Sequence, residues 1–281
     1  MTDAAEYRKE SRTRWGAAAK GWAAQAEAMG RTTMPVSVWM VDALGLQPGY
    51  EVLELAAGTG EVGFLVAEQI ASTGTLISSD FVPEMITVAQ ARAEKLGITN
   101  VRFRQIDAES IDQPAASLDG VLCRWGYMLM ADPEAALRET RRILKPGARL
   151  ALAAWAGPAE NPWASLPMGE LVERGHVERP EPGAPGQFRW ARPGTIEEHL
   201  DAVGFTEYEV DTVDFANVYP SVDAWIAINS DCSMMLRSAL ERLDAAERED
   251  VIAAIREKAL PFVREDGSAV VPARTWVAAA A

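Results

Sequence analysis

The sequence predicts an α/β fold built around a doubly wound, parallel β-sheet. Between residues 50 and 155, five short apolar segments alternate with segments that have the periodicity of amphipathic helices. Helix-ending signals, among them Gly97 and Lys145-Pro146-Gly147, separate the two kinds of segment. Parallel sheets bind their ligands at the carboxyl ends of the strands. We therefore expect a site formed by residues 56–60, 80–85, 107–109 and 124–128.

The first 45 residues form an N-terminal helical lead-in to this pattern. A helix over residues 4–29 places Trp15 and Trp22 on one side, where they can pack on the rest of the protein or close over a ligand. We count both as candidate cofactor-binding residues. A second short helix, over residues 35–44, ends before the turn Gln47-Pro48-Gly49.

Residues 46–156 form the predicted core. Asp132 and Pro133 are an N-cap and a first-turn proline for one of its helices. We expect strands at residues 50–56, 75–79, 101–106, 118–124 and 149–155, and helices at residues 61–71, 83–96 and 133–144.

The pattern changes after residue 156. Residues 157–194 are predicted to be a cap or lid insertion, with a helix at 161–175 and a Pro- and Gly-rich loop at 179–194. Residues 195–281 complete the sheet, with a helix at 195–203, strands at 205–215 and 270–278, and a helical insertion of two helices at about 221–262. Half of a set of large apolar residues should fill the interface between cap and core, and the rest should line an apolar pocket: Trp163, Phe188, Trp190, Trp225, Met234 and Met235.

Composition excludes several classes of function. The 281 residues are 48% hydrophobic and 24% charged, as in a packed soluble protein. The net charge of −14 disfavours nucleic acid as a partner, although Arg8, Lys9, Arg12 and Arg14 form a local basic patch. Two cysteines and two histidines are too few for a disulfide framework or a metal site. Without an apolar leader or a membrane-length apolar run, we expect a cytoplasmic protein with no membrane insertion.

A glycine-rich loop follows the first predicted strand. Gly58, Gly60 and Gly63 satisfy the G-x-G-x-x-G pattern, and Asp80 follows Gly58 by 22 residues. This is what a dinucleotide-binding unit shows, so an NAD-dependent oxidoreductase is one hypothesis.

Other acidic residues favour a different adenosyl ligand. Glu54 precedes the loop by four residues, where a ligand with a cationic ammonium group would need a carboxylate. Asp107, Ala108 and Glu109 provide a carboxylate, a backbone N–H and a second carboxylate, which can pair with the edge of an adenine.

With these motifs in place, the chain resembles the class I S-adenosylmethionine-dependent methyltransferases, in particular the ubiquinone/menaquinone C-methyltransferase-like (type 11) branch. The resemblance covers residues 10–156 and rests on four motifs in order: Val52-Leu53-Glu54-Leu55-Ala56-Ala57-Gly58-Thr59-Gly60, Asp80-Phe81-Val82-Pro83-Glu84-Met85, Asp107-Ala108-Glu109 and Leu144-Lys145-Pro146-Gly147. Together with the strand pattern, it predicts a Rossmann-like, mostly parallel seven-stranded sheet with an antiparallel last strand, N-terminal helices and a helical cap insertion.

The resemblance also implies roles for individual residues. Glu54 would support the loop or the ammonium group of S-adenosylmethionine, and Asp80 would hold the ribose hydroxyls. Asp107 and the Ala108 N–H would pair with the adenine, with Glu109 beside them. The remaining implied cofactor contacts are the loop residues Ala56, Ala57, Gly58, Thr59 and Gly60, the adenine-lining Phe81 and Met85, and the methionine-facing Arg124, Trp125 and Gly126.

One position departs from the family pattern. Ala56 stands where the family usually has glycine. Alanine is tolerated there if its backbone is not left-handed, and the remaining glycines keep the match.

The implied chemistry is an in-line displacement that proximity alone can accelerate strongly, so no catalytic constellation is required. A small apolar or aromatic acceptor is favoured, with methylation at O, N or C. If a base is needed, His176 and Tyr127 are candidates and His199 is a weaker one. A non-catalytic adenosyl-ligand-binding protein and an RNA methyltransferase remain alternatives, and the oligomeric state stays open.

Overall fold

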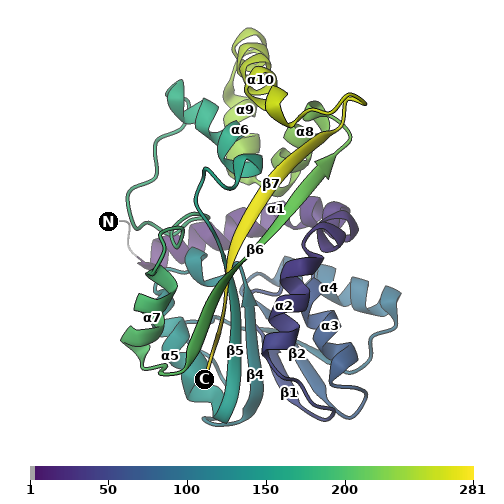
Figure 1. Ribbon diagram of the computed structural model, residues 1–281, viewed down its shortest axis with the longest axis vertical. Coiled ribbons are helices and arrows are strands. Elements are labelled where there is room, and N and C mark those ends of the chain that lie inside the picture. Colours follow the sequence, from purple (N-terminus) through teal and green to yellow (C-terminus); the bar gives the residue numbers. More distant parts are fainter. Residues whose placement is uncertain (1–3) are drawn as a thin grey trace.

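A computed structural model describes residues 4–281 and contains a seven-stranded sheet with helices on both faces (Figure 1). The strand order is β3-β2-β1-β4-β5-β7-β6. The five strands from β3 to β5 are mutually parallel, whereas β7 is antiparallel to both of its neighbours. This arrangement confirms the predicted fold class. The seven strands are β1 (Glu51–Glu54), β2 (Thr75–Asp80), β3 (Val101–Gln105), β4 (Leu118–Arg124), β5 (Leu144–Trp155), β6 (Tyr208–Tyr219) and β7 (Ala269–Ala280).

Two layers of helices cover the sheet. The helices α2 (Met34–Ala43), α3 (Glu61–Gln69) and α4 (Pro83–Leu96) pack on one face. The helices α5 (Pro133–Ile143) and α7 (Thr195–Val203) pack on the other, as Figure 1 shows. Apolar residues recur on the inner side of each helix and meet the nearly continuous apolar runs of the central strands, which is how a sheet buried on both faces is stabilised.

Local signals set most of the helix boundaries in the core. Gly97 ends α4 with a left-handed backbone, φ = 71°. The Asp132 carboxylate caps α5 by accepting a hydrogen bond from the Ala135 N–H. Strand β5 begins earlier than predicted, at Leu144 rather than at residue 149, because Leu144 already pairs with Leu118 before residues 145–148 interrupt the register.

The last two strands, β6 and β7, form a long antiparallel hairpin at one edge of the sheet. All twelve residues of β6 pair with β7, from Tyr208 with Ala280 to Tyr219 with Ala269. Strand β7 also pairs with β5, so the C-terminus lies inside the sheet and β6 forms its edge. Both strands run further than the sequence predicted.

The far end of the hairpin carries a helical lobe (Figure 1). Its helices are α6 (Pro162–Glu173), α8 (Val222–Cys232), α9 (Met234–Arg242) and α10 (Ala245–Ala259). The prediction of two helices between residues 221 and 262 is wrong. Ser233 and Asp244 cap α9 and α10, respectively, and these caps divide the segment into three helices.

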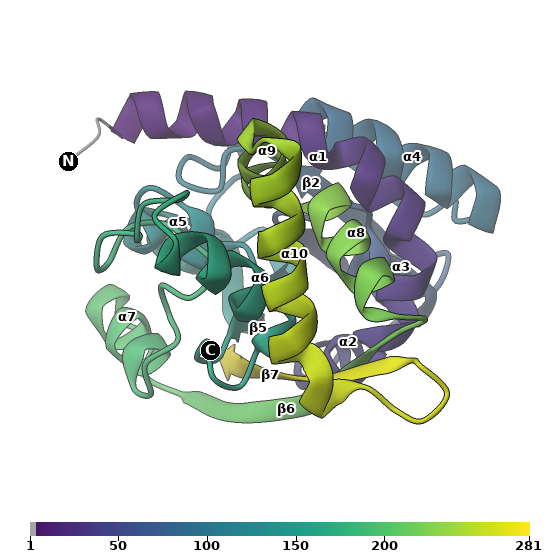
Figure 2. The same cartoon turned by 90° about the horizontal axis from the view of Figure 1, so that it is seen from above.

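Helix α1 (Ala4–Thr32) crosses above the carboxyl ends of the parallel strands and runs along α4 (Figure 2). It also packs on α8 of the lobe. The close approach depends on Gly21, because a Cβ there would overlap the Asp231 carbonyl group at the end of α8. Helix α1 therefore connects the core to the lobe above the predicted site.

Within residues 4–281, none of the helices combines the length and the apolar character needed to cross a membrane. The same residues contain no group of three His, Cys, Asp or Glu side chains arranged to hold a metal ion.

Candidate functional site

The loop that joins β1 to α3 turns sharply at the carboxyl edge of the sheet. The Ala57 N–H donates to the Ser79 carbonyl oxygen at 2.9 Å, which ties the loop to β2. Gly58 and Gly60 have left-handed backbones, with φ of 56° and 85°. A Cβ at Gly60 would lie 2.5 Å from the Phe64 ring, whereas a Cβ at Gly58 would meet nothing within 4 Å. The loop therefore packs on the protein at Gly60 and leaves an open surface at Gly58.

Ala56 does not meet the condition under which alanine is tolerated at this position. Its φ is +51°, so it has a left-handed backbone. This conformation costs an L-residue with a Cβ about 1–2 kcal/mol. The residue is exposed at the carboxyl edge, beside the open surface of Gly58.

Glu54 supports the loop from beneath. Its side chain is buried, with Oε1 accepting from the Gly63 N–H at 2.9 Å and Oε2 accepting from Ser78 Oγ at 3.2 Å. A Cβ at Gly63 would overlap the Glu54 carboxylate, which explains the third glycine of the motif. Burial raises the pKa of Glu54 to about 8 against the opposing effects of the Gly63 hydrogen bond and Arg124. Of the two implied roles, these contacts support the structural one.

Asp80 lies at the end of β2, and its carboxylate binds the backbone of two segments of the site. Its Oδ2 accepts from the Gly58 N–H at 2.8 Å, and its Oδ1 accepts from the Val82 N–H at 2.9 Å. Burial raises the pKa of Asp80 to about 6. Each carboxylate oxygen has a second lone pair, so Asp80 can still accept a hydrogen bond from a ligand hydroxyl.

The side chains of Thr59 and Arg124 belong to a buried polar network and do not line an open surface. Thr59 Oγ1 donates to Glu61 Oε1 at 2.5 Å. Arg124 donates to Thr33 Oγ1 at 2.7 Å and forms an ion pair with Glu61 Oε2 at 3.2 Å. Burial lowers the pKa of Arg124. The Arg124 side chain is thus directed toward α2 and α3, and its position facing the methionine moiety stays a prediction.

Trp125 and Gly126 follow the end of β4. Trp125 has a left-handed backbone, φ = 58°, which is rare for a bulky residue. Its indole stacks on Trp155 with 4.2 Å between ring centroids and donates to Thr275 Oγ1 at 2.9 Å. A Cβ at Gly126 would lie 2.5 Å from Cys123 Sγ and 2.8 Å from the Ala56 Cβ, so the ends of β4 and β1 meet here.

The residues after β3 suit an adenine edge. Asp107 Oδ1 accepts from the Glu109 N–H at 3.0 Å. Ala108 is buried, and among the hydrogen bonds of the described residues its N–H has no acceptor. A buried backbone donor needs a partner, and an adenine ring nitrogen is one. Glu109 is already engaged, because Arg8 and the Ala131 N–H both donate to it.

Helix α1 covers the side of the site formed by Phe81 and Met85. Trp15 and Trp22 lie with their ring centroids 5.8 Å apart in a cluster that includes buried Met85. Trp22 Nε1 donates to the Cys232 carbonyl oxygen at 3.0 Å. The Arg12 guanidinium lies 4.4 Å from the centroid of the Phe81 ring.

The candidate bases do not gather at the site. Tyr127 is 1% exposed and its hydroxyl bonds to Thr140 Oγ1 at 2.6 Å; burial raises its pKa well above the ordinary value, which argues against a base. His199 stacks on Trp190 beside Glu134, and burial lowers its pKa. His176 follows the outer end of α6 in the helical lobe.

The cap residues divide between interior and surface. Trp190 and Trp225 are fully buried, and Trp163 packs on Trp155 with 4.9 Å between ring centroids. Met235 is 46% exposed. Phe188 and Met234 are half-buried.

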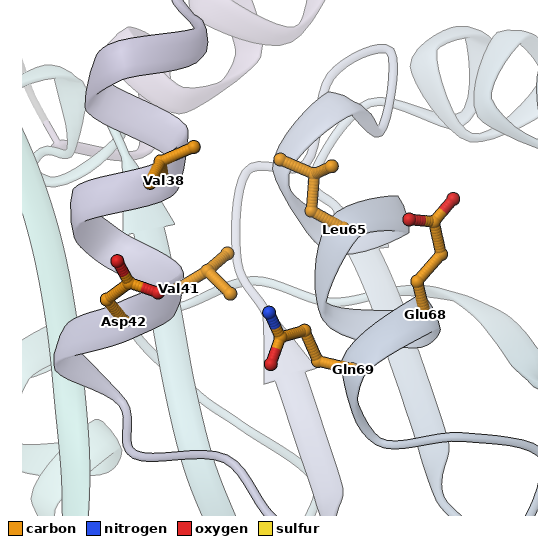
Figure 3. Close-up of a pocket in the computed structure, with 6 residues that line it drawn as sticks. All are labelled: Val38, Val41, Asp42, Leu65, Glu68 and Gln69. Carbon is orange, nitrogen blue, oxygen red and sulfur yellow. The ribbon is translucent and has the colours of Figure 1, made fainter.

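Two surface cavities lie away from the carboxyl edge. One, of about 290 Å³, separates α2 from α3 and is lined by Val38, Val41, Asp42, Leu65, Glu68 and Gln69 (Figure 3). The other, of about 260 Å³, lies near Lys145 at the opposite end of β4 and β5. Neither contains a predicted site residue.

Sequence reasoning missed four residues that lie around the site: Tyr7, Arg8, Glu61 and Arg189. Tyr7 donates to the Leu129 carbonyl oxygen at 2.6 Å, and Arg189 donates to the Met130 carbonyl oxygen at 2.7 Å. Arg8 had a signal, since it belongs to the basic patch of the N-terminus. Its partners Asp107 and Glu109 are about 100 positions away, so the sequence alone does not pair them.

Comparison with known proteins finds similarity over the cofactor-binding half of the chain. Residues 46–174 match the family described as "Methyltransferase domain". The ubiquinone/menaquinone biosynthesis C-methyltransferase UbiE of Cellvibrio japonicus is 33% identical over 119 residues, which cover 42% of this chain and 48% of that protein. The demethylmenaquinone methyltransferase of Thermus thermophilus is 29% identical over 184 residues, covering 60% of this chain and 80% of that protein.

The chain spans about half the length of the UbiE relatives that it matches. The YcgJ protein of Bacillus subtilis has the same fold, with a TM-score of 0.57 and 19% identity over 87% of this chain and 96% of that one. The family match, the relatives and the fold lead to one conclusion: residues 46–174 match a methyltransferase domain and are similar to the ubiquinone/menaquinone C-methyltransferases.

Proposed function

We propose that the protein transfers the methyl group of S-adenosylmethionine to a small-molecule acceptor. The observation that carries the proposal is the alignment of three features at the ends of neighbouring strands. Gly58 has an open surface after β1, Asp80 keeps acceptor capacity after β2, and the Ala108 N–H lacks a partner after β3. An adenosyl ligand lying across these ends would use all three.

The chain's own residues would mainly bind and orient. The bound cofactor supplies an electrophilic methyl group with a good leaving group. The loop that contains Ala57 and Gly58 would hold the methionine and ribose portion, and Asp80 would accept from the ribose hydroxyls. Asp107 and Ala108 would hold the adenine, while Trp125 and Gly126 would border the reacting end. Holding the acceptor in line can contribute roughly 7–11 kcal/mol of the rate acceleration.

The acceptor we favour is one that is nucleophilic without help from a protein base. Tyr127 and His199 are engaged in the interior of the protein, and His176 lies in the outer lobe. Carboxylates, phenolates and amines fit this condition. Half-buried Phe188 and Trp163 support an apolar or aromatic body. UbiE is named for ubiquinone and menaquinone biosynthesis, and the Thermus enzyme for demethylmenaquinone. The UbiE match covers only the cofactor-binding half of this chain, so it does not extend the quinone acceptor to this protein.

The proposal also includes the class of the acceptor and the cellular location of the protein. A small-molecule acceptor is favoured over nucleic acid because the basic patch is engaged: Arg8 binds carboxylates, and Arg12 and Arg14 lie over aromatic rings. A cytoplasmic location is supported by Cys123 and Cys232, which are both free thiols.

The strand order argues against the dinucleotide hypothesis. Gly63 does not decide between the two ligands, because it lets α3 pack closely on Glu54 of β1, and the third glycine of a dinucleotide-binding loop has the same role. The antiparallel strand β7 lies between β5 and β6, whereas the dinucleotide-binding sheet continues with parallel strands.

Asp80→Asn provides the first test. Calorimetry should show saturable binding of S-adenosylhomocysteine by the unmodified protein and binding weaker by about tenfold, or roughly 1.4 kcal/mol, in the variant. Asp112→Asn is the matched control, because that side chain is 98% exposed and pairs only with Arg104 at the surface. Transfer of labelled methyl into a metabolite extract would then distinguish an enzyme from a non-catalytic binder.

Failure of the purified protein to bind S-adenosylhomocysteine would overturn the proposal. A saturable response to reduced nicotinamide cofactor in its place would restore the oxidoreductase hypothesis.

A further inference from the structure

Arg189 is unusual among the basic residues of this protein. Within residues 4–281 it is the one partly buried Lys or Arg that has no carboxylate within ion-pair distance. The other unpaired cations are exposed to solvent. Burial lowers the pKa of Arg189, as expected for a cation without a close counter-charge.

The hydrogen bonds of Arg189 leave part of its guanidinium free. Nη1 donates to the Met130 carbonyl oxygen at 2.7 Å, and the described residues provide no acceptor for Nε or Nη2. Neither of these nitrogens is a buried atom without a partner, so both reach solvent. Two parallel N–H donors on one edge of a guanidinium match the two oxygens of a carboxylate.

The surroundings of Arg189 belong to the substrate side of the proposed site. The short turn η1 (Tyr127–Leu129) lies shortly after β4, and two segments bind its backbone. Tyr7 of α1 donates to the Leu129 carbonyl oxygen at 2.6 Å, and the Gly186 N–H donates to the Met128 carbonyl oxygen at 3.1 Å. Arg189 therefore lies where α1, the cap segment and the end of β4 meet.

Neighbouring acids do not satisfy the Arg189 charge. Glu109 is paired with Arg8, and Asp132 caps α5 and lies 3.8 Å from Arg138. Glu134 lies beside Arg138 and His199. Tyr7 is close enough for its hydroxyl and the Arg189 guanidinium to affect each other electrostatically, and the phenol is largely buried.

We propose that Arg189, with Tyr7 beside it, is a carboxylate-binding subsite for the acceptor, which is then an apolar or aromatic carboxylic acid. This inference rests on the proposed methyl transfer. The methionine carboxylate of the cofactor is a second source of the same chemistry. We assign the acceptor because the methionine end of the cofactor belongs beside Ala56 and Gly126, whereas Arg189 is anchored four residues beyond Gly126.

The test uses 2-naphthoate and its uncharged counterpart 2-naphthalenemethanol as probes, in the presence of saturating S-adenosylhomocysteine. The unmodified protein should bind naphthoate at least about tenfold more tightly than the alcohol, and Arg189→Gln should lose this preference. Arg192→Gln is the matched control, since Arg192 lies in the same segment, is 63% exposed and pairs with Glu198. Arg189→Lys should retain part of the preference because it keeps the charge.

The ratio of the two probes is insensitive to a partly unfolded variant, because unfolding weakens the binding of both. Absence of naphthoate binding by the unmodified protein, or an unchanged ratio in Arg189→Gln, would overturn the assignment. If Arg189→Gln instead weakens S-adenosylhomocysteine and leaves the naphthoate preference intact, the subsite belongs to the cofactor and the assignment to the acceptor is wrong. Loss of S-adenosylhomocysteine binding in the unmodified protein would count against the proposed function itself.

Discussion

At the scale of single residues, backbone strain gathers where the predicted site lies. Four non-glycine residues among those described have a positive φ, and two of them, Ala56 and Trp125, lie just after the neighbouring strands β1 and β4. Such conformations persist only when their surroundings enforce them. Trp125 is held by its stacking on Trp155 and its hydrogen bond to Thr275. Ala56 has no side-chain interaction that offsets the strain of its backbone. A substitution at this residue can therefore measure the free energy of that strain.

Ala56→Gly should stabilise the protein. Relief of the left-handed strain contributes about 1–2 kcal/mol, and the greater freedom of glycine in the unfolded chain costs about 0.4–1 kcal/mol. We expect the free energy of unfolding in urea to rise by up to about 1.6 kcal/mol.

Ala57→Gly is the matched control for that measurement. Ala57 is the next residue, and its φ is not positive. It should therefore show only the entropic cost and lose about 0.4–1 kcal/mol. Equal losses in both variants would mean that the backbone of Ala56 is not strained in solution.

At the scale of elements, the chain from residue 50 to 155 was predictable because its signals are local. Gly97 ends α4, and Asp132 caps α5 as expected. The division of this segment into α8, α9 and α10 also has local signals, because Ser233 and Asp244 are the N-caps of α9 and α10. Helix-forming residues on both sides of each cap made these signals hard to recognise in the sequence. The site loop was predictable from its glycines, whereas the left-handed Ala56 was not, because nothing in the residue type requires it.

Contacts between distant elements were not predictable in the same way. Arg8 donates a hydrogen bond to Glu109, which is 101 positions away in the sequence. Tyr7 donates one to Leu129, which is 122 positions away. Each of these polar groups has many possible partners in the sequence, and only the packing of α1 across the sheet edge selects one. The covering of the site by α1 is therefore a property of the fold.

The contact between α1 and α8 can be tested at two glycines of the same helix. Gly21→Ala would drive a methyl group into the Asp231 carbonyl group, whereas Gly16→Ala would meet only the end of the flexible Glu84 side chain, at 3.1 Å. Both variants gain up to about 1 kcal/mol of helix propensity. We expect Gly16→Ala to be neutral or stabilising and Gly21→Ala to lose roughly 1–3 kcal/mol through overpacking, measured by urea unfolding.

Hydrogen exchange should locate that loss. Amides of α8 should exchange faster in Gly21→Ala than in Gly16→Ala, because α8 would lose its support on α1. If the two variants have the same stability and the same exchange in α8, the two helices are not in backbone contact.

At the scale of the whole molecule, sequence order and spatial order differ. The predicted divisions at residues 156 and 194 follow changes in composition, yet the last twelve-residue strand returns to the core sheet and lies between β5 and β6. Leu150, Leu152 and Val277 are all fully or almost fully buried in this region. The helical lobe is thus carried on strands that belong to the core sheet, so movement of the lobe and the shape of the site are coupled.

This coupling predicts the result of cutting the chain in the loop before α7. Gly183 is exposed and a Cβ there would meet nothing within 4 Å, so a specific protease site inserted after it should be accepted and cleaved in the folded protein. The two fragments should remain together on gel filtration, because β7 of one lies between β5 of the other and its own partner β6. They should separate only in urea concentrations that unfold the protein. Separation in native buffer would show that residues 195–281 form an independent unit, as the change in composition alone suggests.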